Sequence, residues 1–226
     1  MHWRGNLAPA RGPMSDFLLT AIVTLFVTID PPGLAPVFIV LTAGRTRAER
    51  RATAIRATII AGAVLIAFAL VGEPLIGFLG ISLPAFRIAG GLLLFVIAFE
   101  MVFGRREERK SVAAQTAVDR DELRHIAVFP LAIPLITGPG AISATILLAS
   151  QAHSLGAMAG LIAIIVVLIA ACLAVFLLAH DLERILGDTG RIVVSRLLGL
   201  ILAALAVQFV ADGTTAIVKA AAAATG

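Results

Sequence analysis

Six long apolar runs, separated by short polar segments, dominate the pattern of this chain. Each run is long enough to cross the roughly 30 Å hydrocarbon core of a bilayer as a helix. The short alternating segments that membrane β-strands require are absent. The pattern therefore predicts an all-α membrane protein with six transmembrane helices. The runs are Phe17–Leu41, Thr53–Val71, Pro84–Phe103, Ile126–Ala149, Gly156–Ala179 and Val193–Ala211.

Two of these runs are interrupted near their middle. The first contains Asp30-Pro31-Pro32-Gly33, and the fourth contains Thr137-Gly138-Pro139-Gly140. A proline inside a helix removes a backbone hydrogen bond and clashes with the preceding turn. Backbone that is not helical survives in a bilayer only where protein buries it or where it lines a wet cavity. We therefore expect both breaks to face the interior of the helix bundle.

Each break predicts the start of a new half-helix. Asp30 followed by Pro31 is typical of an N-cap and a first-turn proline, and Thr137 would be the cap in the second break. The starts of half-helices present free N–H groups and partial positive charge. The alternative is structural: Asp30 only caps a kink, and the Gly138-Pro139-Gly140 stretch only lets two helices approach closely.

The breaks recur at matching places, which indicates an internal repeat. An offset of about 107 residues places the first break on the second. With three spans in each half, the two halves would lie in opposite orientations. Inverted repeats with matching broken helices point to a secondary-transporter site near the middle of the membrane. The fold class predicted is thus two inverted three-helix repeats, the first helix of each being broken.

This organisation predicts five segments along the chain. Residues 1–13 are polar and rich in proline and glycine, so we expect a disordered extension, with Met14 as an alternative start. Residues 14–104 form the first repeat and residues 126–213 the second. Between them, residues 105–125 form a charged, mobile cytoplasmic linker. Residues 214–226 form a C-terminal tail.

Composition agrees with a membrane protein, and charge orients it. The chain is 60% apolar, whereas soluble domains are about 45–50% apolar. Its net charge of +4 does not indicate nucleic-acid binding. Of the 18 lysines and arginines, all but Arg4, Arg11, Arg87 and Lys219 lie in or beside the segments after the first, third and fifth runs. By the positive-inside rule these segments are cytoplasmic, so both termini face outward from the cell inner membrane.

Candidate chemistry outside the breaks is sparse. Cys172 is the one cysteine, so it forms no internal disulfide and no cysteine-rich metal site. Motifs of nucleophilic catalysis and phosphate binding are missing from the sequence, and we therefore expect neither an enzyme nor a cofactor. Gln208, in the sixth run, is a candidate for a polar group at a solute site.

Three segments resemble the MarC family of bacterial six-helix inner-membrane proteins. They are "DPPGLAPVF" (30–38), "FLGISLPAFRIAGGLLLFVIAFEMVFG" (78–104) and "AVFPLAIPLITGPGAISATILLAS" (127–150). The resemblance covers about Ser15 to Gly213 and implies transport of small neutral amino acids such as alanine and glycine. The family has Asn or Asp at position 30. It often has an aliphatic residue where this chain has Pro32, so a stiffer break is expected here.

The leading hypothesis is a secondary transporter of a small neutral solute, with H+ or Na+ as candidate coupling ions that the sequence does not distinguish. The carboxylate of a zwitterion would lie on the N–H groups of the second break, and its ammonium would face Asp30. The rival hypotheses are an ion or proton pathway and a non-transporting membrane scaffold. Partners would be the solute and the lipid bilayer, and a homo-oligomer is compatible with the pattern. The candidate site residues are Asp30, Pro31, Gly33, Thr137, Gly138, Pro139, Gly140 and Gln208.

Overall fold

The computed structural model describes residues 13–119 and 126–224, and the regular structure in these two ranges is helical. The predicted extension lies almost entirely outside the described residues, and so does the end of the predicted linker. The elements are α1 (Pro13–Ile29), α2 (Pro31–Leu41), α3 (Arg47–Phe78), α4 (Leu83–Val102), α5 (Arg105–Asp119), the π-helix η1 (Ala127–Ile136), α6 (Pro139–Ala149), α7 (Leu155–Leu177) and α8 (Ala179–Ala224).

The helices confirm an all-helical membrane protein with five or six spans. Within the described residues, five stretches are long and apolar enough to cross a membrane, and the first of them joins α1 to α2. The sixth is the pair η1 and α6, whose axes are bent by 59°. The uninterrupted stretches are Arg47–Phe78, Leu83–Val102, Leu155–Leu177 and Ile192–Ala223.

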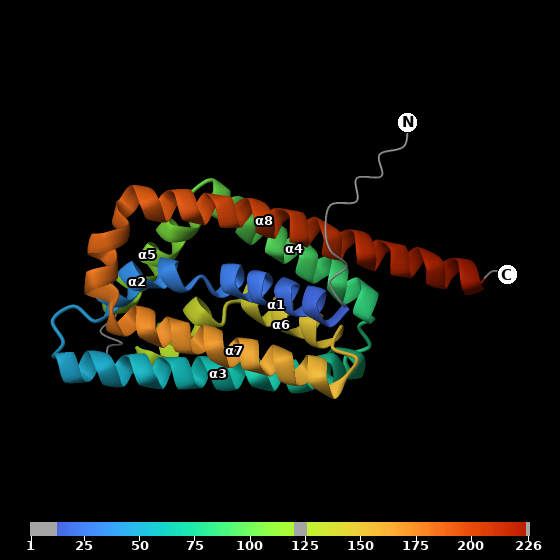
Figure 1. Ribbon diagram of the computed structural model, residues 1–226, viewed down its shortest axis with the longest axis horizontal. Coiled ribbons are helices and arrows are strands. Elements are labelled where there is room, and N and C mark those ends of the chain that lie inside the picture. The colour runs from blue at the N-terminus through green and yellow to red at the C-terminus, as the bar shows by residue number, and fades with distance from the viewer. Residues whose placement is uncertain (1–12, 120–125, 225–226) are drawn as a thin grey trace.

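The two broken helices occupy the centre of the bundle. In Figure 1, α1, α2 and α6 lie between α3 and α7 on one side and α4 and α8 on the other. In its most apolar window, the Met14–Leu41 span is 67% buried, against 22% for Ile192–Ala223. The outer helices instead expose large apolar side chains, which suits contact with lipid: examples are Ile59, Leu92, Phe95, Val167, Leu197 and Val207.

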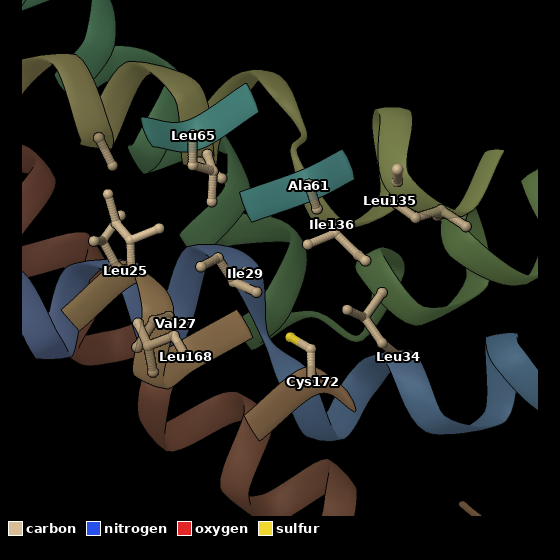
Figure 2. Close-up of a cluster of buried hydrophobic side chains, with 14 of the residues drawn as sticks. Leu25, Val27, Ile29, Leu34, Ala61, Leu65, Leu135, Ile136, Leu168 and Cys172 are labelled. Atoms are coloured by element: carbon tan, nitrogen blue, oxygen red, sulfur yellow. The ribbon is translucent and has the colours of Figure 1, made fainter. Parts of the chain in front are cut away.

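Close packing of aliphatic side chains holds the broken helix in this central position. Figure 2 shows Leu25 and Ile29 of α1 and Leu34 of α2 among side chains from α3, η1 and α7. All three are fully buried. The backbone on both sides of Asp30 is therefore fixed from several directions.

Two segments predicted as a linker and a tail are helical in the structure. The tail predicted for residues 214–226 continues α8 as far as Ala224, because its alanine-rich sequence has a high helix propensity. The segment predicted as a mobile linker forms α5 over Arg105–Asp119. Figure 1 also shows α8 turning a corner, with the start of α1 and the end of α8 at the same end of the bundle.

Candidate functional site

At the first break the chain turns through Asp30. Its φ of 56° places it in the left-handed region, which Asp and Asn tolerate better than most residues. Its N–H donates to the carbonyl of Phe26 at 2.8 Å and thereby closes α1. Its Oδ1 accepts the N–H of Gly33 at 3.2 Å and thereby caps α2. The predicted N-cap is confirmed.

Pro31 and Gly33 allow the carboxylate of Asp30 to cap α2. Pro31 and Pro32 have no N–H, so the N–H of Gly33 is the first donor that α2 offers to a cap. A Cβ added to Gly33 would lie 2.2 Å from Oδ2 of Asp30. Only glycine therefore leaves room for the carboxylate at this position.

At the second break the predicted cap is wrong. The hydroxyl of Thr137 donates backwards to the carbonyl of Ala132 at 3.0 Å, and its N–H donates to the same oxygen at 2.9 Å. Gly138 is the N-cap of α6, and no side chain caps that helix. The start of α6 therefore keeps the partial positive charge of an uncapped helix.

The half-helix before this break is irregular. Phe129 and Ile133 have extended backbone angles inside η1, and the peptide bonds that follow them, to Pro130 and Pro134, are cis. The residue before a proline is disfavoured in the α region, which explains why the helix is interrupted at these two places. The fourth run is therefore broken in three places rather than one.

The chain supplies its own cations to the carboxylate of Asp30. From α5, Lys110 Nζ lies 2.8 Å and Arg106 Nε 3.9 Å from Oδ2 of Asp30. Arg106 also donates to the carbonyl of Thr28 and, at 3.4 Å, to Sδ of Met101. Asp30, Arg106 and Lys110 are all at most 6% exposed. Such a buried ionic cluster holds α5 inside the bundle, since removing one partner leaves a buried charge unpaired.

Burial lowers the pKa of Lys110, and the neighbouring Asp30 carboxylate opposes that shift. The guanidinium of Arg106 stays charged under ordinary conditions. Lys110 thus already holds Oδ2, the place where the sequence hypothesis puts the ammonium of a zwitterion. In this arrangement the carboxylate of Asp30 is not free for a solute.

A cavity of about 400 Å³ lies between the two breaks and α5. Ligand pockets are typically about 300–1,000 Å³, so this volume suits a small solute. Two larger hollows, of 760 Å³ and 560 Å³, lie near the helix ends beside Arg47 and Glu73, away from the breaks. The 400 Å³ cavity is lined by Thr28, Leu93, Val96, Ile97, Arg106, Arg109, Lys110, Pro134, Leu135, Gly138, Pro139, Gly140 and Ala141.

The structure brings most predicted site residues to this region. Gly138, Pro139 and Gly140 line the cavity directly. Asp30 contacts two of the lining residues, Lys110 and Arg106. Pro31, Gly33 and Thr137 lie in the two breaks and do not line the cavity. Gln208 does not join them: it is exposed on α8 and donates to Oδ1 of Asp212 at 2.8 Å.

Sequence reasoning missed the three cations of the cavity wall. Arg106 and Lys110 stand four residues apart, so one helical face carries both of them. Arg109 lies between them and pairs with Oε1 of Glu100 at 2.9 Å. Two cations four residues apart, in a chain with an acid in the middle of a transmembrane run, could have indicated that this segment pairs with Asp30.

These features define a multi-pass helical membrane protein with a cavity between two broken helices, whose mostly apolar wall carries three cationic side chains. The chain belongs to the MarC family of integral membrane proteins, whose family model matches residues 15–218. A UPF0056 membrane protein of Archaeoglobus fulgidus is 41% identical over 205 residues, covering 88% of this chain and 92% of the relative. The UPF0056 membrane protein YhcE of Escherichia coli is 37% identical, covering 84% and 88%.

A further relative, the UPF0056 membrane protein YvbG of Bacillus subtilis, is 35% identical over 201 residues, with 88% of this chain and 95% of the relative covered. All three relatives therefore share nearly the whole length of this chain. No solved structure matches the chain.

Proposed function

We propose that this protein is a secondary transporter of small neutral solutes, such as the amino acids alanine and glycine. The observation that carries the proposal is the 400 Å³ cavity whose wall includes Thr28 at the first break and residues 138–141 at the second. Broken helices that meet at a cavity in mid-membrane are typical of solute sites in secondary transporters. The volume fits a solute with a short side chain.

The packing of the outer helices supports the proposed inverted repeat. The second helices of the two halves, α3 and α7, pack together, and so do the third helices, α4 and α8. Gly199 of α8 packs against Met101 and the carbonyl of Ala98 in α4, while Gly91 of α4 packs against the carbonyl of Ala206 in α8. A twofold relation between the halves would produce this reciprocal pairing, and it would allow the cavity to open to either side in turn.

The proposal includes an orientation. The protein would lie in the cell inner membrane with the cation-rich segments after α2 and α7 in the cytoplasm, with α5 entering the bundle from the cytoplasmic side, and with both termini outside. The common end of the bundle shared by the start of α1 and the end of α8 supports an even number of crossings (Figure 1).

Uptake into proteoliposomes tests this function. We expect labelled alanine or glycine to accumulate under an imposed H+ or Na+ gradient in the native protein. Gly138→Leu places a large side chain in the cavity wall and should abolish accumulation. Gly77→Leu is the matched control, because a Cβ at Gly77 has no neighbour within 4 Å in the described structure and the residue lies away from the breaks.

Other results would point elsewhere. If the folded native protein accumulates neither amino acid under either gradient, the proposal for this solute class is wrong. Ion flow without solute movement would favour an ion or proton pathway. If neither ions nor solutes cross, the scaffold hypothesis gains.

A further inference from the structure

We propose that the cavity binds a monovalent anionic group between Arg106 and the start of α6. The group would be either the carboxylate of the solute or a free inorganic anion. Where it is the carboxylate, the proposal rests on the proposed function and narrows its substrates to solutes that carry a carboxylate. Three observations support it, two of them on Arg106 and one on α6.

The first observation is an unbalanced charge. Arg106 and Lys110 share the single carboxylate of Asp30, so one positive charge is left over. Arg109 and Glu100 balance each other. Among the described residues, the acids whose charge acts on Arg106 are Asp30 and Glu100, and the carboxylate that acts on Lys110 is Asp30. A surplus buried charge is unfavourable unless a counter-charge joins it.

The second observation is an unpartnered donor. Arg106 is 5% exposed and lines the cavity, yet its Nε makes no hydrogen bond within the described structure. A buried donor without a partner is unfavourable by about 1–3 kcal/mol, and more for a charged group. An oxygen or halide in the cavity would satisfy both the donor and the surplus charge.

The third observation is the start of α6, which also lines the cavity. Gly138, Gly140 and Ala141 line the cavity there, and this eleven-residue helix has no side-chain cap. The N–H groups of its first turn and its partial positive charge favour an anion. α6 therefore adds to the positive potential of Arg106 instead of cancelling it. A single surplus charge in a cavity of this size suits a monovalent group.

In this account Asp30 is an internal counter-ion, and its removal should strengthen anion binding. Asp30→Asn doubles the surplus charge while preserving the backbone of the first break, because Asn tolerates the left-handed region and its Oδ1 can still cap α2. A site in which Asp30 binds the ammonium of a solute predicts the reverse. The same substitution thus separates the two arrangements.

Binding to the purified full-length protein in lipid nanodiscs, measured by calorimetry, tests the proposal. The probes are alanine, propionate and ethylamine, each with and without chloride. We expect alanine and propionate to bind and ethylamine not to bind. Competition by chloride would assign a free anion as the natural occupant, and its failure to compete would assign the carboxylate.

The variants carry the quantitative test. We expect Asp30→Asn to bind propionate about threefold or more tightly and Arg106→Gln to bind it about tenfold more weakly. Arg106→Lys, which keeps the charge, should retain part of the affinity and covers the case in which Arg106→Gln fails to fold. Arg51→Gln removes an exposed arginine that does not line the cavity and should change nothing.

Several results would overturn the proposal. Ethylamine binding in place of propionate, or weaker propionate binding in Asp30→Asn, would make Asp30 the ligand-binding group. Equal affinities in the native protein and Asp30→Asn would show that the charge of Asp30 does not act on the bound group, which this proposal requires. If uptake fails while the charge-dependent binding persists, the proposed function fails alone. If uptake proceeds while the affinity for propionate is the same in all variants, this inference is wrong and the proposed function stands.

Discussion

At the residue scale, Asp30 connects the local backbone to the cavity. Its N–H closes α1, its Oδ1 caps α2, and its Oδ2 holds Lys110 and Arg106. The cap could be predicted from the sequence, because an acid before a proline has few other roles in a helix. The ion pairs could not, because they join residues about 80 positions apart.

Lys110→Met tests how strongly this cluster stabilises the protein. It removes the 2.8 Å hydrogen bond to Asp30 and leaves that carboxylate only the longer contact to Arg106, so it should lower the free energy of unfolding by about 1.5–3 kcal/mol. Arg109→Met, on the same helix, breaks a pair whose arginine side chain is 61% exposed, and it should lower the free energy by less than about 1 kcal/mol. Denaturant unfolding in detergent micelles measures both losses.

The double variant Asp30→Asn with Lys110→Met is the control for this comparison. It removes both charges of the Lys110 pair but leaves the buried Arg106 without its carboxylate, so it should be less stable than Lys110→Met alone, in which Arg106 still faces Asp30. Equal small losses for Lys110→Met and Arg109→Met would mean that the buried pair contributes no more than an exposed one.

At the element scale, the long apolar helices follow from their sequence, and the irregular elements do not. Apolar runs of transmembrane length predicted α4 and α7 closely, because in a bilayer the backbone has no alternative to a helix. They predicted only the middle of α3, which continues into polar residues at its start and extends from Arg47 to Phe78. The fourth run had the same composition, but Pro130 and Pro134 interrupt η1 well before the predicted break.

The second break shows a similar limit. Thr137 has the right residue type and place for an N-cap, yet its hydroxyl bonds to Ala132 instead. That bond depends on the path of the preceding irregular turn, which cap preferences do not describe. Residue preferences at helix starts predicted where α6 begins. They did not predict the hydrogen bonds at that start.

The segment that forms α5 was predicted to be a mobile linker because its charged side chains were expected to be exposed to water. Its residues favour helices, and its polar composition suggested a mobile connection. The decisive factor is tertiary: two of its cations, Arg106 and Lys110, find a carboxylate inside the bundle. The polarity of a segment alone does not show whether its charged side chains are exposed to water or form ion pairs inside the protein.

At the scale of the whole molecule, the broken helices are enclosed and the unbroken helices meet lipid. This follows from the sequence, since irregular backbone has to be shielded from hydrocarbon. The pairing of α3 with α7 and of α4 with α8 suits the proposed inverted repeat, but its residue-by-residue similarity is weak because most positions need only be apolar. The cavity could not be predicted, because its wall depends on α5.

The proposed orientation can be tested with single cysteines. In a Cys172→Ala background, His153→Cys lies in the segment before α7 and Arg47→Cys at the start of α3, and both native residues are exposed. We expect a membrane-impermeant thiol reagent to label His153→Cys on intact cells and Arg47→Cys only after permeabilisation. The opposite pattern would reverse the protein in the membrane.

The most direct test of the account is substrate protection of a cysteine in the cavity wall. Ala141→Cys, in the Cys172→Ala background, is a small change at a residue that lines the cavity, and His153→Cys is the control outside it. We predict that alanine slows the modification of Ala141→Cys severalfold and leaves His153→Cys unchanged. An unchanged rate at Ala141→Cys, under conditions in which alanine is taken up, would place the solute somewhere other than between the two breaks.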